Sequence, residues 1–187
     1  MAEDAFVETA LKAATEVLAS PLTIERGACL LYEITVDNRL ALAVDPRDPR
    51  RGQSAFQTDL CVFESVADKV RMPRVVLEFK ERLTTHDVLT YSAKARKHKQ
   101  VYPYLRYGLV VSALSILPGR YFKHNEALDF AVAAAAYGTS RLHHLFEKLL
   151  TAEVAASRQL EAITFDKIGV NLVRTEIVIE KNGGRVG

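Results

Sequence analysis

The sequence predicts an α/β fold in which a central mixed sheet is flanked by helices. Short runs rich in β-branched and aromatic residues, such as 58–63 and 75–80, are typical of strands. Other segments, such as 2–19, repeat apolar residues at the spacing of an amphipathic helix. Because both kinds of segment alternate along 187 residues, we expect a single domain, 1–187, with a full hydrophobic core.

Residues 2–19 are the first predicted helix, which Ser20-Pro21 ends. Its apolar stripe consists of Phe6, Val7, Ala10, Leu11, Ala14, Val17 and Leu18. Glu8 and Glu16 lie off this stripe, where helix charges are usually solvated. The pattern predicts a helix that packs one face on the sheet.

Residues 29–44 indicate a hairpin, because two apolar runs are separated by the turn signal Asp37-Asn38. Residues 45–52 are then a loop, rich in proline and charge. The loop carries Arg47, Arg50 and Arg51. These arginines either contact phosphates or are solvated, and the sequence leaves both interpretations open.

The two strands at 58–63 and 75–80 carry charge where buried strands are usually apolar. Side chains two apart share a face, so Glu78 and Lys80 project together, and Asp59 lies on the face away from Leu60 and Val62. The opposite face of the second strand is filled by Val75, Leu77 and Phe79. If the strands pair, two carboxylates and one ammonium group converge, and a bound cation would relieve the repulsion between the carboxylates.

After Lys80 the pattern becomes helical. Thr84 or Thr85 can cap this helix, and Asp87 suits its first turn. A modest apolar stripe consists of Val88, Leu89, Ser92 and Ala95, and the other faces carry Lys94, Arg96, Lys97, His98 and Lys99. This basic cluster predicts contact with a phosphate backbone, with a solvated helix face as the alternative.

The remaining chain predicts a strand at 107–117, helix at 125–162, and a last strand at 170–180 that Asn182-Gly183-Gly184 ends. The helical part is either one helix or two that meet near Gly138. The predicted order is therefore helix, three strands, helix, strand, helix and a final strand.

Composition narrows the class of protein. Hydrophobic residues at 49% and charged residues at 26% argue against disorder, and a net charge of +2 says little about partners. Cys29 and Cys61 are far apart in sequence, which predicts neither a zinc site nor a disulfide and indicates a reducing cytoplasm. We expect no membrane span and no export signal. His143 and Glu147 sit four apart and could share a metal, but an ordinary surface contact is the commoner outcome.

Two short motifs resemble a known family. Asp59, followed nineteen residues later by Glu78-Phe79-Lys80, resembles the Asp…Glu-x-Lys signature of the PD-(D/E)XK nuclease superfamily. Gln100 to Tyr104 resembles the Gln-xxx-Tyr element of its RecB-like branch. Thr58 stands where the family often has proline, and Pro103 leaves open whether Tyr104 joins the site.

The resemblance implies a restriction-endonuclease-like core of αβββαβ order, over about 1–118, with 119–187 as a C-terminal helical elaboration. It further implies DNA as the substrate. In the family an acidic residue of the first helix sometimes joins the metal shell, which makes Glu8 and Glu16 candidates.

The function we expect is that of a metal-dependent DNA endonuclease of restriction or repair type. Asp59 and Glu78, with the backbone carbonyl of Phe79, would hold Mg²⁺ or Mn²⁺ and so lower the pKa of a bound water. Lys80 would orient or deprotonate that water, or stabilise charge on the phosphate, and Gln100 would fix the water or a backbone phosphate. The residues expected to contact DNA are Lys94, Arg96, Lys97 and Lys99.

Two alternatives belong to other classes. A catalytically inactive DNA-binding module on the same fold would keep the basic helix but hold no metal. A structural protein that dimerises through its alanine-rich helix would have no affinity for nucleic acid. Cutting of both strands would favour a homodimer, since one active site addresses one scissile bond.

Overall fold

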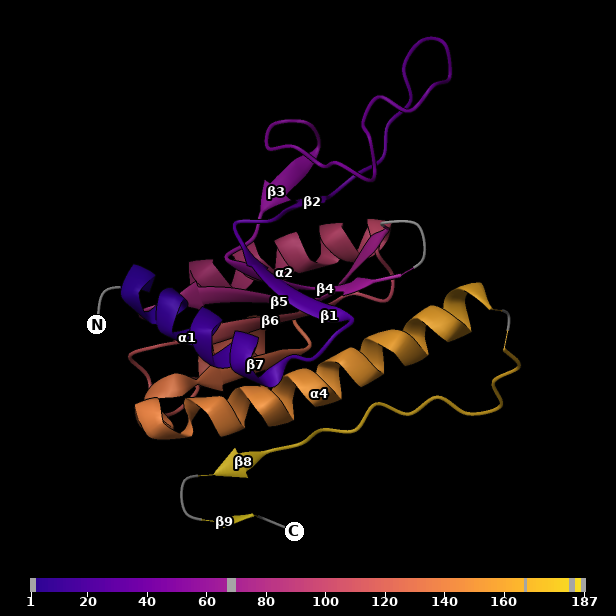
Figure 1. Cartoon of the computed structure of the whole chain (residues 1–187). Helices are drawn as coiled ribbons and strands as arrows, with labels where there is room; N and C mark the ends of the chain where they lie inside the picture. The colour runs from indigo at the N-terminus through magenta and orange to yellow at the C-terminus, as the bar shows by residue number, and fades with distance from the viewer. Residues whose placement is uncertain (1–2, 67–69, 167, 182–183, 186–187) are drawn as a thin grey trace.

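The computed structural model describes residues 3–66, 70–166, 168–181 and 184–185, and its centre is a five-stranded mixed sheet (Figure 1). The strands lie in the order β1-β4-β5-β6-β7. They are β1 (Leu22–Arg26), β4 (Leu60–Ser65), β5 (Arg71–Lys80), β6 (Arg106–Val111) and β7 (Phe130–Ala133). The first three pair antiparallel, and β5, β6 and β7 pair parallel. This mixed sheet confirms the α/β class.

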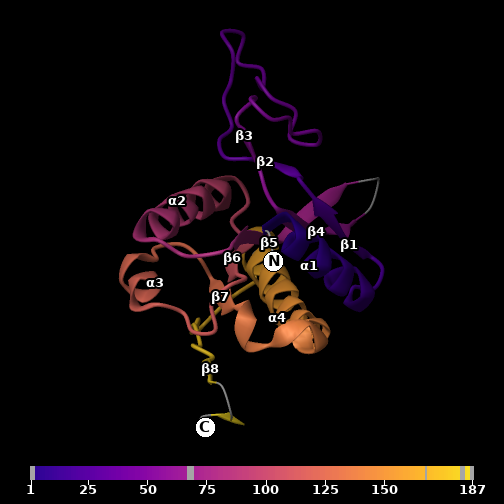
Figure 2. The ribbon, with the colours of Figure 1, turned by 90° about the vertical axis from the view of Figure 1, so that its left-hand side faces the viewer.

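Helices cover both faces of the sheet, as Figure 2 shows. On one face lie α1 (Glu3–Val17) and the long α4 (Gly138–Phe165); on the other lie α2 (Thr85–Val101) and the short α3 (Gly119–His124). The inward stripe of α1 packs on Val75, Leu77 and Phe79 of β5, as the alternation of that strand predicts. Within the described ranges, no helix is both long and apolar enough to cross a membrane.

The helix predicted after Lys80 is confirmed as α2. Thr84 caps it: its hydroxyl accepts a hydrogen bond from the Asp87 backbone N–H, and the Asp87 carboxylate accepts one from the Thr84 backbone N–H. The buried face of α2 consists of Val88, Ser92, Ala95 and His98.

The hairpin predicted over 29–44 is wrong in its pairing. The chain forms β2 (Cys29–Leu31), which pairs with β3 (Ala55–Gln57), and residues 32–54 between them project away from the sheet (Figure 1). We call residues 32–54 the arm. Only an isolated bridge between Val36 and Leu42 remains of the predicted hairpin. Leu30 and Leu31 are buried and pair with β3, whereas Leu40 and Leu42 are exposed, so burial decides which apolar run becomes a strand.

The prediction of helix over 125–162 is wrong before Gly138. Phe130–Ala133 is β7, followed by one 3₁₀ turn, η2 (Ala134–Ala136), and then α4. A side chain at Gly108, on the neighbouring strand, would meet the ring of Phe130, so the glycine permits close approach of β7 to β6. Residues 119–187 therefore supply a strand of the central sheet as well as helices.

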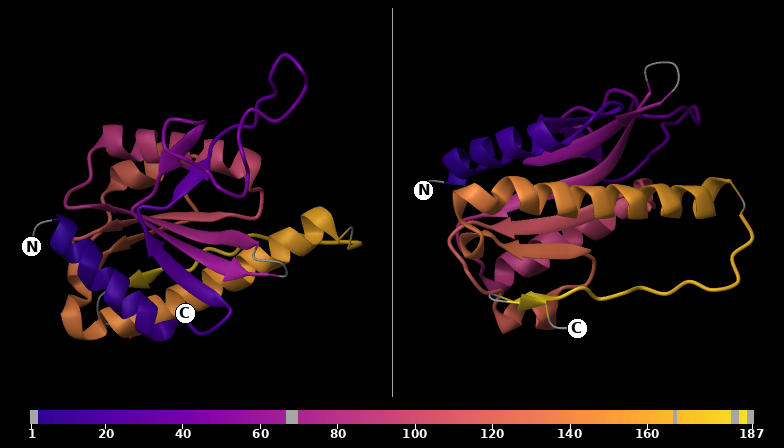
Figure 3. Two further views of the ribbon diagram at one scale, coloured as in Figure 1. Left: turned by 45° about the horizontal axis from the view of Figure 1, so that its top comes forward. Right: turned by 60° about the horizontal axis from the view of Figure 1, so that its bottom comes forward.

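The strand predicted over 170–180 is also wrong for most of its length. Residues 170–179 run exposed and outside any strand of the described chain, back along α4 (Figure 3). Only β8 (Glu180–Lys181) and β9 (Gly184–Arg185) pair, and Asn182-Gly183 lies outside the described residues. None of residues 170–179 is buried, so this alternating segment packs no apolar face on the sheet.

The main elements follow one another as α1, β1, β4, β5, α2 and β6, which is the αβββαβ order. The sequence analysis did not predict β1. The β2–β3 ribbon and the arm are inserted after this strand. The strand predicted over 107–117 is shorter, Arg106–Val111. This order brings the ends of β4 and β5 together beside the start of α1.

Candidate active site

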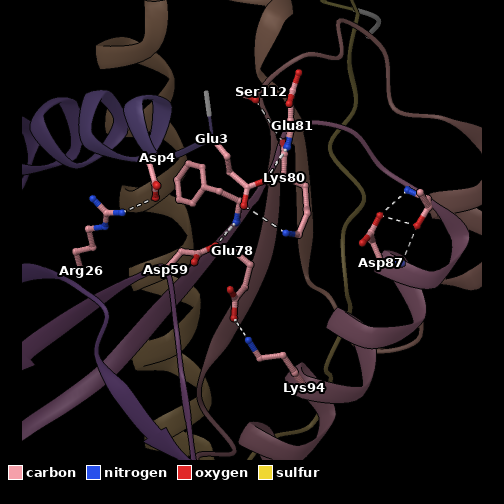
Figure 4. A network of polar contacts seen from close by, with 12 residues as sticks. Glu3, Asp4, Arg26, Asp59, Glu78, Lys80, Glu81, Asp87, Lys94 and Ser112 are labelled. Carbon is pink, nitrogen blue, oxygen red and sulfur yellow. Dashed lines mark hydrogen bonds and ion pairs between the residues drawn. The ribbon is translucent and has the colours of Figure 1, made fainter. Parts of the chain in front are cut away.

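Asp59 lies just before β4, where the ladder between β4 and β5 ends (Figure 4). The last pair of that ladder is Leu60 with Leu77, so continuing the register brings Asp59 beside Glu78. The carboxylate of Asp59 accepts a hydrogen bond of 2.7 Å from the backbone N–H of Phe79. One acid from each strand therefore meets at this edge, as the sequence pattern predicts.

Glu78 is a buried carboxylate with only 2% of its surface exposed. Its Oε1 accepts hydrogen bonds from Lys94 Nζ at 2.7 Å and from the Tyr107 hydroxyl at 2.5 Å. Burial raises the pKa of Glu78, the charge of Lys94 opposes this shift, and the negative charge of Asp59 adds to it. Tyr107 was not predicted as a site residue, because it lies within an apolar strand.

Lys80 projects from the same face of β5 as Glu78 and lies beside the start of α1. Its Nζ is 3.3 Å from Glu3 Oε1, and Glu3 Oε2 accepts a hydrogen bond of 3.1 Å from the backbone N–H of Glu81. Partial burial lowers the pKa of Lys80, but Tyr91 and Glu3 outweigh burial and raise it above its usual value. Lys80 therefore carries its proton at neutral pH.

Glu3 is the acidic residue of α1 that reaches this site. The predicted candidates Glu8 and Glu16 do not reach it. Glu8 pairs with Arg26, and Glu16 lies 4.0 Å from His143. No spacing signal singles out Glu3, since the first turn of many helices is acidic.

The site gathers more negative than positive charge. The carboxylates of Glu3, Asp59 and Glu78 face the ammonium groups of Lys80 and Lys94. Carboxylate repulsion at one place is relieved by a proton or by a cation.

The donors present fit a hard divalent metal. Asp59 and Glu78 each bond through one named oxygen, Oδ2 and Oε1, and among the described residues nothing donates to the second oxygen of either. Phe79 directs its N–H toward Asp59, and the carbonyl of the same strand residue points to the same side. Among the described residues, those of this site included, no three His, Cys, Asp or Glu side chains are grouped closely enough to hold a metal by themselves. Mg²⁺ is ordinarily bound by one or two carboxylates and several waters, so two carboxylates and a carbonyl suffice.

A pocket of about 430 Å³ opens beside Asp59. Its lining comes from the end of β1, the arm, β3 and α2. The residues are Arg26, Gly27, Arg51, Ala55, Phe56, Gln57, Thr58, Asp59 and Lys94. Three cationic side chains therefore surround a cavity that reaches one of the two central carboxylates.

Gln100 and Tyr104 lie away from these groups. Gln100 is exposed in the last turn of α2, six positions after Lys94 and thus about 240° around the helix axis from it. Tyr104 is buried near the other end of β5, with the Arg74 guanidinium 5.5 Å from its ring centre. The residue that α2 presents to Glu78 is Lys94.

The basic cluster of α2 does not form one surface. Lys94 pairs with Glu78, Lys99 lies 2.7 Å from Asp129, and Arg96 lies 3.7 Å from Glu126. Lys97 is exposed. Helical periodicity points neighbouring residues in different directions, so a sequence cluster is divided among several contacts.

Three further predictions concern histidines and cysteines, and the placement of His98 on a face of the helix away from the apolar stripe is wrong. His98 is buried, its Nδ1 lies 3.0 Å from the Leu31 carbonyl oxygen, and burial lowers the pKa of His98 to about 4. His144, rather than His143, approaches Glu147, at 3.6 Å. Cys29 and Cys61 are free thiols, as predicted.

Comparison with protein-family models and with curated proteins finds no match for this sequence.

Proposed function

We propose that this protein is a metal-dependent DNA endonuclease that hydrolyses phosphodiester bonds on a restriction-endonuclease-like core. The observation that carries the proposal is the meeting of Asp59, Glu78 and Lys80 at the shared end of β4 and β5. The Asp…Glu-x-Lys motif and the αβββαβ order support it. Together they favour this family over an unrelated α/β domain.

Asp59, Glu78 and the Phe79 carbonyl are the groups that would hold Mg²⁺ or Mn²⁺. Such an ion supplies Lewis-acid stabilisation of the phosphate and a water of lowered pKa. Tyr107 and Lys94 donate hydrogen bonds to Glu78 Oε1 and so hold this carboxylate in place although it and Asp59 repel each other.

Lys80 acts in this proposal as a positive hydrogen-bond donor. Its raised pKa keeps the ammonium form, which stabilises negative charge that develops on a phosphate oxygen and cannot accept a proton. Glu3 orients the Lys80 side chain from the first turn of α1. Of the roles that the sequence left open, the structure therefore favours charge stabilisation over general-base catalysis.

The test is cleavage of plasmid DNA with and without Mg²⁺ by the wild type and by Lys80→Ala. We expect Lys80→Ala to lose cleavage, by about 10²–10³-fold, while its DNA affinity stays the same. Lys12→Ala, an exposed lysine on α1, is the matched control and should cut as the wild type does. Unaltered cleavage by Lys80→Ala would refute the assignment.

A second candidate is a DNA-binding module without turnover. The observation in its favour is that Lys94 and Lys80 already pair with Glu78 and Glu3, so the charges are partly neutralised by the protein itself. The module predicts DNA binding that is indifferent to Mg²⁺, and no cleavage by the wild type.

A further inference from the structure

The pocket beside Asp59 is lined by an aromatic side chain as well as by charged ones. Phe56 of β3 lines the pocket and keeps 37% of its surface exposed. Phe122 and Phe165 are more exposed, but neither lines this pocket. An exposed aromatic face among cations is the arrangement that proteins use to bind unpaired nucleotides.

The ring of Phe56 is held in a fixed position. Tyr32, at the base of the arm, stacks on it with ring centres 4.1 Å apart and an angle of 23°. The ring of His98 meets it edge-on at 5.8 Å and 88°. His98 is itself anchored at the Leu31 carbonyl oxygen. A ring that stacks on Tyr32 and makes a T-shaped contact with His98 is held in position, and its exposed part can serve as a platform for a base.

The cations of the pocket come from three separate elements and lie around this platform. Lys94 Nζ is 3.4 Å from the Gln57 carbonyl oxygen, and Arg51 approaches Gln57 Oε1 at 3.4 Å. Both contacts are long for hydrogen bonds, so a phosphate offers Arg51 a stronger partner. Lys94 also donates a 2.7 Å hydrogen bond to Glu78, and its ammonium group has a third N–H that can donate to a phosphate. Arg26 is held at the rim by Asp4 and Glu8.

We propose that the substrate enters this pocket as a single strand, with one unpaired base stacked on Phe56 and its phosphate held by Arg51 and Lys94. The inference rests on the nuclease function proposed above and names its substrate class. A base within a duplex has both faces covered by its neighbours and cannot stack on a side chain in a pocket. A volume of about 430 Å³ lies within the usual range for one small ligand and does not admit a duplex.

This arrangement assigns a role to the arm. Tyr32 and Arg51 lie at its two ends, so the inserted segment supplies both the support of the platform and one of its cations. A single strand also removes the need for two copies of the site, since only one bond has to be cut in each strand that binds.

The experiment measures binding of a labelled oligonucleotide by fluorescence anisotropy in EDTA, where no cleavage occurs. Three probes are compared: a single strand, the same strand in a duplex, and a strand of abasic sites that keeps the phosphates and lacks the bases. We expect the wild type to bind the single strand about tenfold more tightly than the duplex or the abasic strand. Phe56→Leu should lose about tenfold on the single strand and nothing on the abasic strand.

Phe122→Leu is the matched control, because Phe122 is an exposed aromatic on α3 outside the pocket and its loss should change no affinity. Arg51→Gln, at an exposed position, tests the site without touching the core and should weaken binding to all three probes. Equal affinity for single strand and duplex, or a Phe56→Leu variant that folds and binds as the wild type does, would overturn the inference.

Cleavage in Mg²⁺ separates this inference from the proposed function. If the single strand binds in the expected pattern but is never cut, the nuclease function fails, and what stands is a binding site for an unpaired nucleotide without turnover. If the wild type cuts DNA and Phe56→Leu binds single strands normally, the substrate inference fails and the nuclease function stands.

Discussion

Charged side chains lie at both ends of β5, but the carboxylates at the two ends are balanced by cations to different degrees. At its start, Arg74 is almost fully buried and lies 2.7 Å from Glu64 and 2.5 Å from Glu161. Arg158 also donates two hydrogen bonds to Glu64 Oε1, the shorter at 2.6 Å. At its other end, three carboxylates, those of Glu3, Asp59 and Glu78, lie with only two ammonium groups, those of Lys80 and Lys94.

The consequence is opposite shifts for two glutamates of the same small sheet. Hydrogen bonds from Arg158 and from Arg74 lower the pKa of Glu64 despite its burial. At the other end burial raises the pKa of Glu78, and Lys94 does not offset it. A network with equal numbers of cations and carboxylates is a structural feature of the fold. A buried carboxylate with a raised pKa is typical of a functional site. The predictions below test this contrast.

The largest expected effect is at the balanced end. Arg74→Ala should lower the free energy of unfolding by about 3–5 kcal/mol, because it leaves Glu64 and Glu161 without their buried partner. Urea unfolding followed by circular dichroism measures this loss. A loss below about 1 kcal/mol would mean that the network is no more than an exposed ion pair.

The second prediction compares the same chemical change at both ends. Glu78→Gln should reduce Mg²⁺-dependent cleavage by about 10²–10³-fold, since it removes a negative charge from the proposed metal site. Glu64→Gln is the matched control and should cut DNA at the wild-type rate, at a temperature where it is folded. Equal losses of cleavage in both variants would show that the two ends do not differ in function.

The third prediction concerns metal and stability. Mg²⁺ at about 100 times its dissociation constant should stabilise the wild type by about 2.7 kcal/mol, because the ion binds the folded protein alone. Glu78→Gln should show no such gain, while Glu64→Gln should retain it. Thermal unfolding with and without Mg²⁺ measures the difference, and a gain that survives in Glu78→Gln would place the ion elsewhere.

The smallest effect is the pH dependence of stability, where the two glutamates act with opposite sign. The folded-state pKa of Glu78 is raised, so the protein loses stability as pH rises from the unfolded value toward the folded one. The folded-state pKa of Glu64 is lowered, so its contribution is lost as pH falls through the folded value. Subtracting the stability curves of Glu78→Gln and Glu64→Gln from that of the wild type should reveal slopes of opposite sign, and slopes of the same sign would contradict the contrast.

Much of the centre of the molecule follows from local sequence. The alternation in 75–80 fixes which face of β5 is buried, and the pairing of two strands then brings Asp59 beside Glu78. The apolar stripe of α1 and the capping box at Thr84 are equally local signals.

What could not be predicted depends on contacts distant in the chain. The alanine-rich residues before Gly138 suit a helix, yet part of that segment is β7 because Gly108 leaves room for Phe130. Tyr107 and Glu3 are ordinary residues of a strand and a helix until the fold sets them beside Glu78 and Lys80. Gln100 matched a motif by its spacing, but the rotation of α2 presents Lys94 instead.

The most direct test of the central claim is calorimetric titration of Mg²⁺, and separately Mn²⁺, into the wild type and into Asp59→Ala. If Asp59 and Glu78 form a cation site, the wild type gives a saturable heat with one ion per chain and Asp59→Ala gives none. The same heat from both proteins would contradict the metal site, and with it the proposed nuclease mechanism.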